Sequence, residues 1–353
     1  MPSVYYINSS NLDTFISRLQ KDFAVFAPFP RDSQTTNTPD YSYRRLNNDD
    51  RVTFNPYRSV EPLKTFFTNP SEKVCDYFNA HPPGPSEKQV VILGVKSCDL
   101  AAHRIQDYVF LEGVEVDSLY SVRRENTFVI SGDCTLFKPV CFCLSLDILP
   151  HPTSGFDLNL SPLNDGYLAE VGSAKGAYLV GLYEGLFSPA KETQVSARQS
   201  KREQLIERLK KHLLPQDIPA KSEFQKLVRE GYHSETWQQF MLTCVECGGC
   251  NLICDTCHCF LLADTRESTG FQKVRKWDSC LYANYARVAG GANPLRLRAQ
   301  RLRNRFMKKF DFFPDNLGIP ACCGCGRCIE VCPGKIDIRE VLKDLAVKAK
   351  ARQ

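Results

Sequence analysis

The spacing of apolar residues predicts alternating helices and strands in the first part of the chain. Residues 11–23 carry apolar side chains every three or four positions, which is typical of a helix with one buried face. Residues 90–95 (VVILGV) and 127–131 (TFVIS) are short runs rich in β-branched residues, as in the central strands of a buried sheet. We expect a helix over residues 100–111, between these strands. This alternation predicts an α/β domain.

The pattern changes near residues 190–220. Before this point, residues 167–171 and 177–180 resemble strands on either side of the turn sequence GSAKG. Residues 196–214 predict a helix, and most of the chain beyond it shows helical spacing and cysteine motifs. We therefore expect an α+β protein of two domains, with an α/β domain over residues 1–195 and an α-helical domain over residues 196–353.

The composition is that of an ordinary folded protein, with 43% hydrophobic and 24% charged residues among 353. The formal net charge of +5 is too small to indicate nucleic acid as a partner. The longest nearly apolar stretch, from Ala177 to Phe187, is too short to span a bilayer, and no secretory signal opens the sequence. We therefore expect a cytoplasmic protein without membrane insertion.

Cysteine is the unusual component, with 17 residues. In a reducing compartment, such a density indicates metal binding or redox chemistry rather than disulfides. Two runs share the spacing C-x2-C-x2-C-x3-C, and the second begins 78 residues after the first. They are Cys244–Cys254 (CVECGGCNLIC) and Cys322–Cys332 (CCGCGRCIEVC).

This spacing is typical of proteins that hold two cubane 4Fe–4S clusters, in which the fourth cysteine of each run binds the other cluster. Zinc is the alternative, but four-cysteine zinc sites usually combine two C-x2-C pairs. The C-terminal domain is therefore predicted to be an α-helical ferredoxin-like domain with two clusters. Cluster one takes Cys244, Cys247, Cys250 and Cys332, and cluster two takes Cys322, Cys325, Cys328 and Cys254.

A second set of cysteines lies in the predicted α/β domain. Cys98 and Cys134 each follow a predicted strand within three residues, and Cys141 and Cys143 come shortly after. Sites gather at the carboxyl ends of strands in an open α/β sheet, so these four thiols could bind a third 4Fe–4S cluster. They could also be small buried residues, a zinc site or a catalytic thiol.

Three further cysteines, Cys257, Cys259 and Cys280, lie between the two motifs. We favour packing and hydrogen bonding around the clusters for them, while a metal site and a redox thiol set stay open. The basic run from Arg296 to Lys309 holds seven Lys and Arg residues and no acid. We interpret it as a helix that offsets thiolate charge or docks an acidic partner.

No glycine-rich phosphate loop with the required context occurs, so the sequence predicts no nucleotide site, and a flavin is not expected. Neither catalytic triads nor metal-spaced histidines stand out. Two enzyme or binding alternatives stay open. The α/β domain could hold a flavin or a substrate and reduce it, or the whole chain could be a zinc-stabilised binding module.

Several stretches together resemble one family, the iron–sulfur β subunits of cytoplasmic NiFe sulfhydrogenases, which are similar to the 4Fe–4S dicluster subunit of anaerobic sulfite reductase. They are GVKSCDLAAHRIQDYVFLEG, RRENTFVISGDCTLFKPVCFC, GFDLNLSPLNDGYLAEVGS and the segment from CVECGGCNLICDTCHCF to CCGCGRCIEVCP. The resemblance covers nearly the whole chain and both cysteine sets. It implies an electron-transfer subunit that lies between two others, a flavoprotein NAD(P)H-oxidoreductase and a catalytic metalloenzyme.

Overall fold

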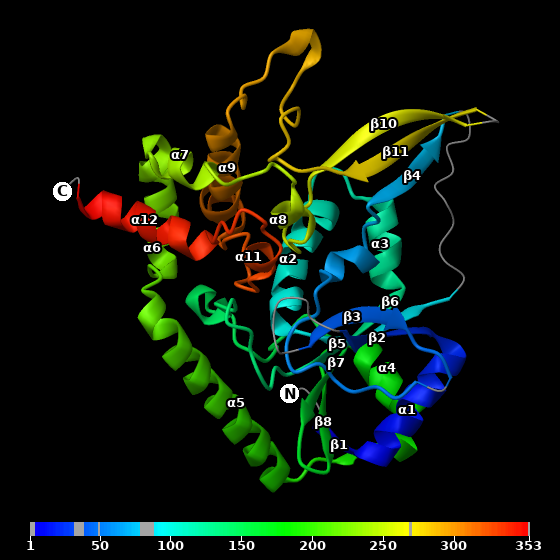
Figure 1. Ribbon diagram of the computed structural model, residues 1–353. Coiled ribbons are helices and arrows are strands. Elements are labelled where there is room, and N and C mark those ends of the chain that lie inside the picture. Colours follow the sequence, from blue (N-terminus) through cyan, green and yellow to red (C-terminus); the bar gives the residue numbers. More distant parts are fainter. Residues whose placement is uncertain (1–3, 32–38, 49, 78–87, 268–269, 352–353) are drawn as a thin grey trace. The chain divides into compact units, whose positions relative to one another are not determined.

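The computed structural model describes residues 4–31, 39–48, 50–77, 88–267 and 270–351, and the chain forms two compact units (Figure 1). Unit 1 combines residues 1–67, 84–139 and 148–210, and unit 2 combines residues 68–83, 140–147 and 211–353. The sequence places the domain boundary at residue 195, before the boundary between the units. The predicted first domain also includes residues 68–83 and 140–147, which belong to unit 2 in the structure.

Helix α5 (Glu192–Leu213) explains the later boundary. Arg198 donates a hydrogen bond of 2.8 Å to Glu170, and Arg202 donates one of 2.7 Å to Asp133. Both carboxylates belong to unit 1. These partly buried ion pairs fix the first part of the helix to that unit, so the helix cannot be assigned to the C-terminal part as a whole.

Unit 1 is built on an eight-stranded sheet with the order β3-β2-β5-β6-β7-β8-β1-β9. The central neighbours β2, β5, β6 and β7 run parallel, and the outer pairs run antiparallel. The strands are β1 (Val4–Asn8), β2 (Ala24–Arg31), β3 (Asp40–Arg45), β5 (Val90–Val95), β6 (Thr127–Gly132), β7 (Leu158–Pro162), β8 (Gly166–Val171) and β9 (Ser188–Pro189). The helices before α5 are α1 (Ser9–Asp22), α2 (Ser97–Leu111), α3 (Ser118–Glu125) and α4 (Ala174–Leu182).

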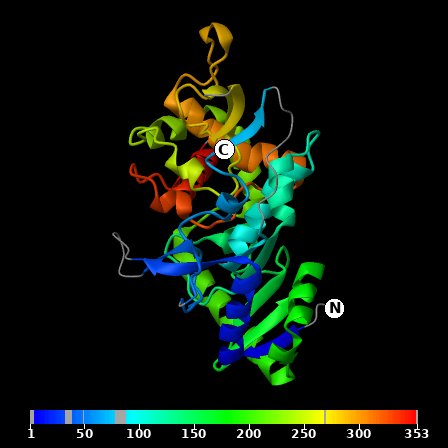
Figure 2. The ribbon, with the colours of Figure 1, turned by 90° about the vertical axis from the view of Figure 1, so that its right-hand side faces the viewer.

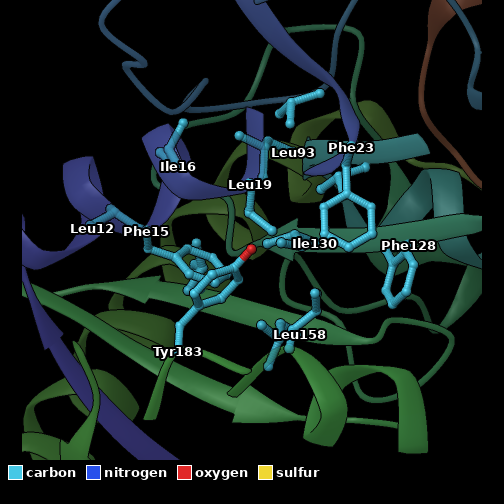
Figure 3. Close-up of a cluster of buried hydrophobic side chains, with 14 of the residues drawn as sticks. Leu12, Phe15, Ile16, Leu19, Phe23, Leu93, Phe128, Ile130, Leu158 and Tyr183 are labelled. Atoms are coloured by element: carbon cyan, nitrogen blue, oxygen red, sulfur yellow. The ribbon is translucent and has the colours of Figure 1, made fainter. Parts of the chain in front are cut away.

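Helices cover both faces of this sheet (Figure 1). Side chains of α1 pack against Leu93 and Ile130 on one face (Figure 3). Leu179 and Val180 of α4 belong to the same cluster. Side chains of α2 and α3 pack against Ile92 and Val129 on the other. Successive residues of a strand point to opposite faces, so two covered faces explain why the central strands are apolar throughout.

The predicted helices over residues 11–23 and 100–111 are confirmed as α1 and α2, and the predicted strands over 90–95 and 127–131 as β5 and β6. The predicted strand over residues 177–180 is wrong, because these residues lie in α4. The hydroxyl of Ser173 accepts a hydrogen bond of 3.2 Å from the backbone N–H of Gly176. The sequence GSAKG therefore begins a helix, where we expected a hairpin turn.

Unit 2 combines helices with a three-stranded antiparallel sheet of order β10-β11-β4. Figure 2 shows the hairpin β10–β11 in yellow beside β4 in light blue. The strands are β4 (Ser71–Asp76), β10 (Phe260–Glu267) and β11 (Gly270–Trp277). The helices are α6 (Lys221–Glu230), α7 (Thr236–Met241), α8 (Gly249–Leu252), α9 (Arg298–Met307), α10 (Phe313–Leu317), α11 (Arg327–Glu330) and α12 (Ile338–Lys350).

The C-terminal part is therefore mixed helix and strand, because the hairpin interrupts the predicted helical insert. Beyond α9, the helix continues as a π-helical segment, Lys308–Phe312, before α10 begins. Within the residues that the structure describes, no helix is both long enough and apolar enough to cross a bilayer.

Phe15 provides a test of the core of unit 1. Its side chain is fully buried in α1, with edge-to-face contacts to Tyr183 and Phe187 at ring-centroid distances of 5.5 and 5.3 Å. We expect Phe15→Ala to lower the free energy of unfolding by about 3–5 kcal/mol, measured by urea unfolding followed by circular dichroism. The exposed control Val114→Ala should change it by less than about 0.5 kcal/mol. A loss below about 1 kcal/mol for Phe15→Ala would contradict this packing.

Candidate metal centre

The two cysteine motifs fold into the same local backbone. Each contains a one-turn helix, α8 or α11, whose N-cap is a glycine with φ of +71°, Gly248 or Gly326. Two residues earlier, Glu246 and Gly324 also have positive φ, at +57° and +64°. A positive φ is a conformation that glycine adopts readily, so the sequence repeat is also a repeat of backbone geometry.

The second motif packs tightly against the segment of residues 140–147. The N–H of Phe142 donates a hydrogen bond of 2.8 Å to the carbonyl of Gly324. A Cβ atom at Gly326 would lie 2.3 Å from the carbonyl oxygen of Val140. This contact leaves no room for a side chain, so glycine is required here for space as well as for φ.

One cavity of unit 2 is lined by cysteines of both motifs. It brings Cys332 together with Cys244, Cys247 and Cys250, and Cys328 also reaches it. Most other residues of its lining are apolar, including Leu281, Leu302, Ile336 and Ile338. Burial raises the pKa of Cys244 and of Cys250, because a thiolate is poorly solvated there.

A second group of thiols contains the remaining predicted ligands. The pKa of Cys322 is raised to about 12 and that of Cys328 to about 11; burial is the largest cause, and the neighbouring Cys254 acts in the same direction. The charge of Cys325 also acts on Cys328. Cys254 therefore lies near the thiols of the other motif. The assignment of all eight cysteines to two clusters stays a prediction.

Two buried cations face these thiols. Lys309 Nζ lies 3.3 Å from Cys254 Sγ and also donates to Thr256 Oγ1 at 2.9 Å and to the carbonyl of Ala321 at 3.0 Å. Arg305 lines the cavity and donates through Nε to Asn251, while its Nη2 has no hydrogen-bond partner among the described residues. The thiols of Cys250 and Cys328, on the two motifs, raise the pKa of Arg305 against the effect of its burial.

Cys254 differs from the other buried thiols, because its pKa lies well below the usual value. The largest cause is a hydrogen bond from Cys257, and the charges of Lys309 and Arg305 act in the same direction. Cys257 therefore stabilises the thiolate form of a predicted cluster ligand. A hydrogen-bonding role near a cluster is the one that we favour from the sequence, and it stays a prediction.

Cys280 contacts Asn251, whereas Cys259 contacts Tyr285 and Lys308. The Asn251 amide donates a hydrogen bond of 3.1 Å to Cys280 Sγ. Lys308 Nζ donates to Tyr285 Oη at 2.7 Å and lies 3.9 Å from Cys259 Sγ. These thiols contact polar groups of unit 2, and their role stays a prediction.

The four cysteines predicted to bind a third cluster do not all belong to the same unit. Cys98 and Cys134 belong to unit 1, where both act on the buried amine of Lys96, and Cys141 and Cys143 belong to unit 2. Burial lowers the pKa of Lys96, although its Nζ donates a hydrogen bond of 3.1 Å to the carbonyl of Asp133. Cys98 and Cys134 follow β5 and β6, as the sequence predicts, and a third cluster stays a prediction.

Sequence reasoning did not identify Asn251, Arg305 and Lys309 as individual residues of the site. The basic run 296–309 is the signal that contains two of them, and its interpretation as a source of charge near thiolates fits their contacts. The run does not predict which cations are buried. Arg305 lies in α9, whereas Lys308 and Lys309 begin the π-helical segment, where each amine lies near a thiol.

Comparisons with known proteins agree with this arrangement. Residues 243–336 match the family model of a 4Fe-4S dicluster domain, a range that contains both motifs. Over 341 residues, the chain is 29% identical to sulfhydrogenase 2 subunit beta of Pyrococcus furiosus, and the alignment covers 96% of this chain and 97% of that protein. The resemblance to sulfhydrogenase β subunits that the sequence predicts is thereby confirmed.

The residues present fit 4Fe–4S clusters. Four thiols around a largely apolar cavity are the donor set that such a cluster needs, and two groups of thiols fit a dicluster domain. Among the described residues, no three His, Cys, Asp or Glu side chains lie close enough to hold a single metal ion. A cubane spreads its ligands over four corners, so it does not need that closeness.

Gly326 provides a test of the second motif. We expect Gly326→Ala to lower the iron content of anaerobically purified protein to about half, because the added Cβ meets the carbonyl of Val140 beside Cys325 and Cys328. Gly290→Ala is the matched control, since Gly290 has φ of +81° and no atom within 4 Å of the added Cβ. It should keep the full iron content. Equal iron loss in both variants would contradict a role for this close contact.

Proposed function

We propose that this chain is an electron-transfer subunit of a cytoplasmic oxidoreductase complex, with two 4Fe–4S clusters and no substrate site of its own. The observation that supports it best is that the last cysteine of each motif lies near the thiols of the other. Cys332 lies at the cavity of the first motif, and Cys254 lies near the thiols of the second. Two cluster sites that share ligands in this way are adjacent, as a relay requires.

The bound clusters would supply the chemistry, which is acceptance and donation of single electrons. The chain holds the ligands in place. The N–H of Glu246 donates to Cys244 Sγ at 3.4 Å, and the N–H of Ile336 donates to Cys332 Sγ at 3.3 Å. Hydrogen bonds to ligand sulfurs favour the reduced, more negative state and so raise the reduction potential.

Apolar side chains exclude water from the first site. Leu281, Leu302 and Ile338 are buried and line its cavity. Cys247 is exposed, so this site also has a side that reaches the surface. An electron can therefore enter or leave near Cys247 while the interior of the site stays dry.

The partners in this proposal come from the resemblance. We propose a flavoprotein NAD(P)H-oxidoreductase subunit on one side and a catalytic metalloenzyme subunit of the hydrogenase or sulfite reductase kind on the other. The similarity to a sulfhydrogenase β subunit supports a multi-subunit complex.

A second candidate function is a reductase subunit with a flavin or substrate site in unit 1. The observation in its favour is the buried Lys96 beside Cys98, Cys134 and Asp133, at the carboxyl ends of two parallel strands. Flavin absorbance in the anaerobically purified subunit would favour this function, and its absence would weaken it.

Metal analysis tests the leading proposal. We expect about eight iron atoms per chain in anaerobically purified protein, or about twelve if the third predicted cluster is present. Dithionite reduction should produce the paramagnetic resonance of reduced 4Fe–4S clusters. Fewer than about four iron atoms, with zinc in their place, would instead support a zinc-stabilised binding module.

Cys98→Ala tests the third predicted cluster, with Cys98, Cys134, Cys141 and Cys143 as ligands. If these four bind a cluster, the iron content should fall by about four atoms while the signals of the other two clusters remain. Cys75→Ala is the control, because Cys75 lies in β4 outside all predicted ligand sets. Unchanged iron in Cys98→Ala would remove the third cluster and leave the two-cluster proposal intact.

A further inference from the structure

Lys309 contacts only one of the two predicted cluster sites. Its side chain is 4% exposed, and Nζ is surrounded by Cys254 Sγ, Thr256 Oγ1 and the carbonyl oxygen of Ala321. None of these three groups is a carboxylate. The positive charge of Lys309 is therefore directed at Cys254.

The site of Cys244 has a different electrostatic environment. Cys244 and Cys332 accept hydrogen bonds from backbone N–H groups. The nearby carboxylate of Glu246 raises the pKa of Cys244, although it is not the largest cause. Arg301 donates to this carboxylate at 2.6 Å, so that cation neutralises an acid rather than a thiolate.

The charge of Arg305 does not favour one of the two sites in the same way. It lines the cavity that Cys250 of the first motif and Cys328 of the second also line. Lys309, by contrast, donates its hydrogen bonds at a single site.

We propose that Lys309 makes the two cluster sites inequivalent, by stabilising the electron at the site of Cys254 and so raising its reduction potential above that of the site of Cys244. A fixed positive charge in a poorly solvated interior favours the more negative, reduced state of its neighbour. This inference rests on the proposed two-cluster function.

The proposed step is the transfer of one electron between the two sites. The electron that leaves the site of Cys244 arrives at the site of Cys254, no bond of the protein forms or breaks, and Lys309 keeps its proton. Lys309 is a positioning residue for charge, since it acts through the ligand Cys254.

The test is a redox titration of the anaerobically purified full chain, followed by paramagnetic resonance. Wild type should show two midpoint potentials. Lys309→Met should lower only the higher one, by at least about tenfold in the equilibrium constant for reduction, which is about 59 mV for a one-electron couple. The signal of cluster two is identified separately, from its changed line shape in Cys322→Ser.

Lys308→Met is the matched control, because it removes the same charge from the adjacent residue, whose contacts are Tyr285 and Cys259. It should leave both midpoints unchanged. Lys309→Arg should retain the wild-type potentials, and Lys309→Gln replaces Lys309→Met if the latter loses iron.

The outcomes separate the two proposals. Absence of iron from the wild-type protein would contradict the proposed function itself. Full iron content with unchanged midpoints in Lys309→Met or Lys309→Gln, or an equal shift of both midpoints, would overturn the role of Lys309 alone. An equal effect of Lys308→Met would show that only the total charge of the unit matters, and would also overturn it.

Discussion

Placing many thiolates in a small, poorly solvated volume requires compensating positive charge, and the architecture of unit 2 follows from this constraint. Burial is the largest cause that raises the pKa of Cys322 and of Cys328 above the usual value of a thiol, and neighbouring thiolates act in the same direction. Bound iron would supply most of the compensation. Lys309, Arg305 and backbone N–H groups supply the part that the chain itself provides.

The same constraint links folding to cofactor binding. The last cysteine of each motif lies near the thiols of the other, so each predicted group of ligands includes a cysteine from the motif that begins 78 residues away. Metal binding then holds together segments that are distant in the chain, and its free energy becomes folding free energy. The long insert between the motifs is free to form the hairpin β10–β11 and helix α9 without separating them.

Local patterns of the sequence predicted what depends on local spacing. The run VVILGV predicts β5 because a strand covered on both faces is apolar at every position. The short apolar stretch at residues 177–180 fits either a strand or a helix, and the cap at Ser173, which decides for a helix, is not visible in periodicity. The cysteine spacing predicted the kind of centre.

Long-range contacts were beyond prediction from the sequence. Residues 140–147 belong to unit 2 because they pack against Gly324 and Gly326, which no local pattern encodes. Likewise, seven basic residues in the run 296–309 indicate positive charge, yet the run does not indicate that Lys309 is the one that contacts Cys254.

The central claim is that the two motifs exchange their fourth cysteine. A crystal structure of the anaerobically purified protein, with anomalous data at the iron edge, tests it most directly. The account predicts two compact iron peaks, with Cys332 Sγ bound at the peak beside Cys244 and Cys254 Sγ bound at the peak beside Cys322. Iron peaks that each bind all four cysteines of a single motif would contradict it.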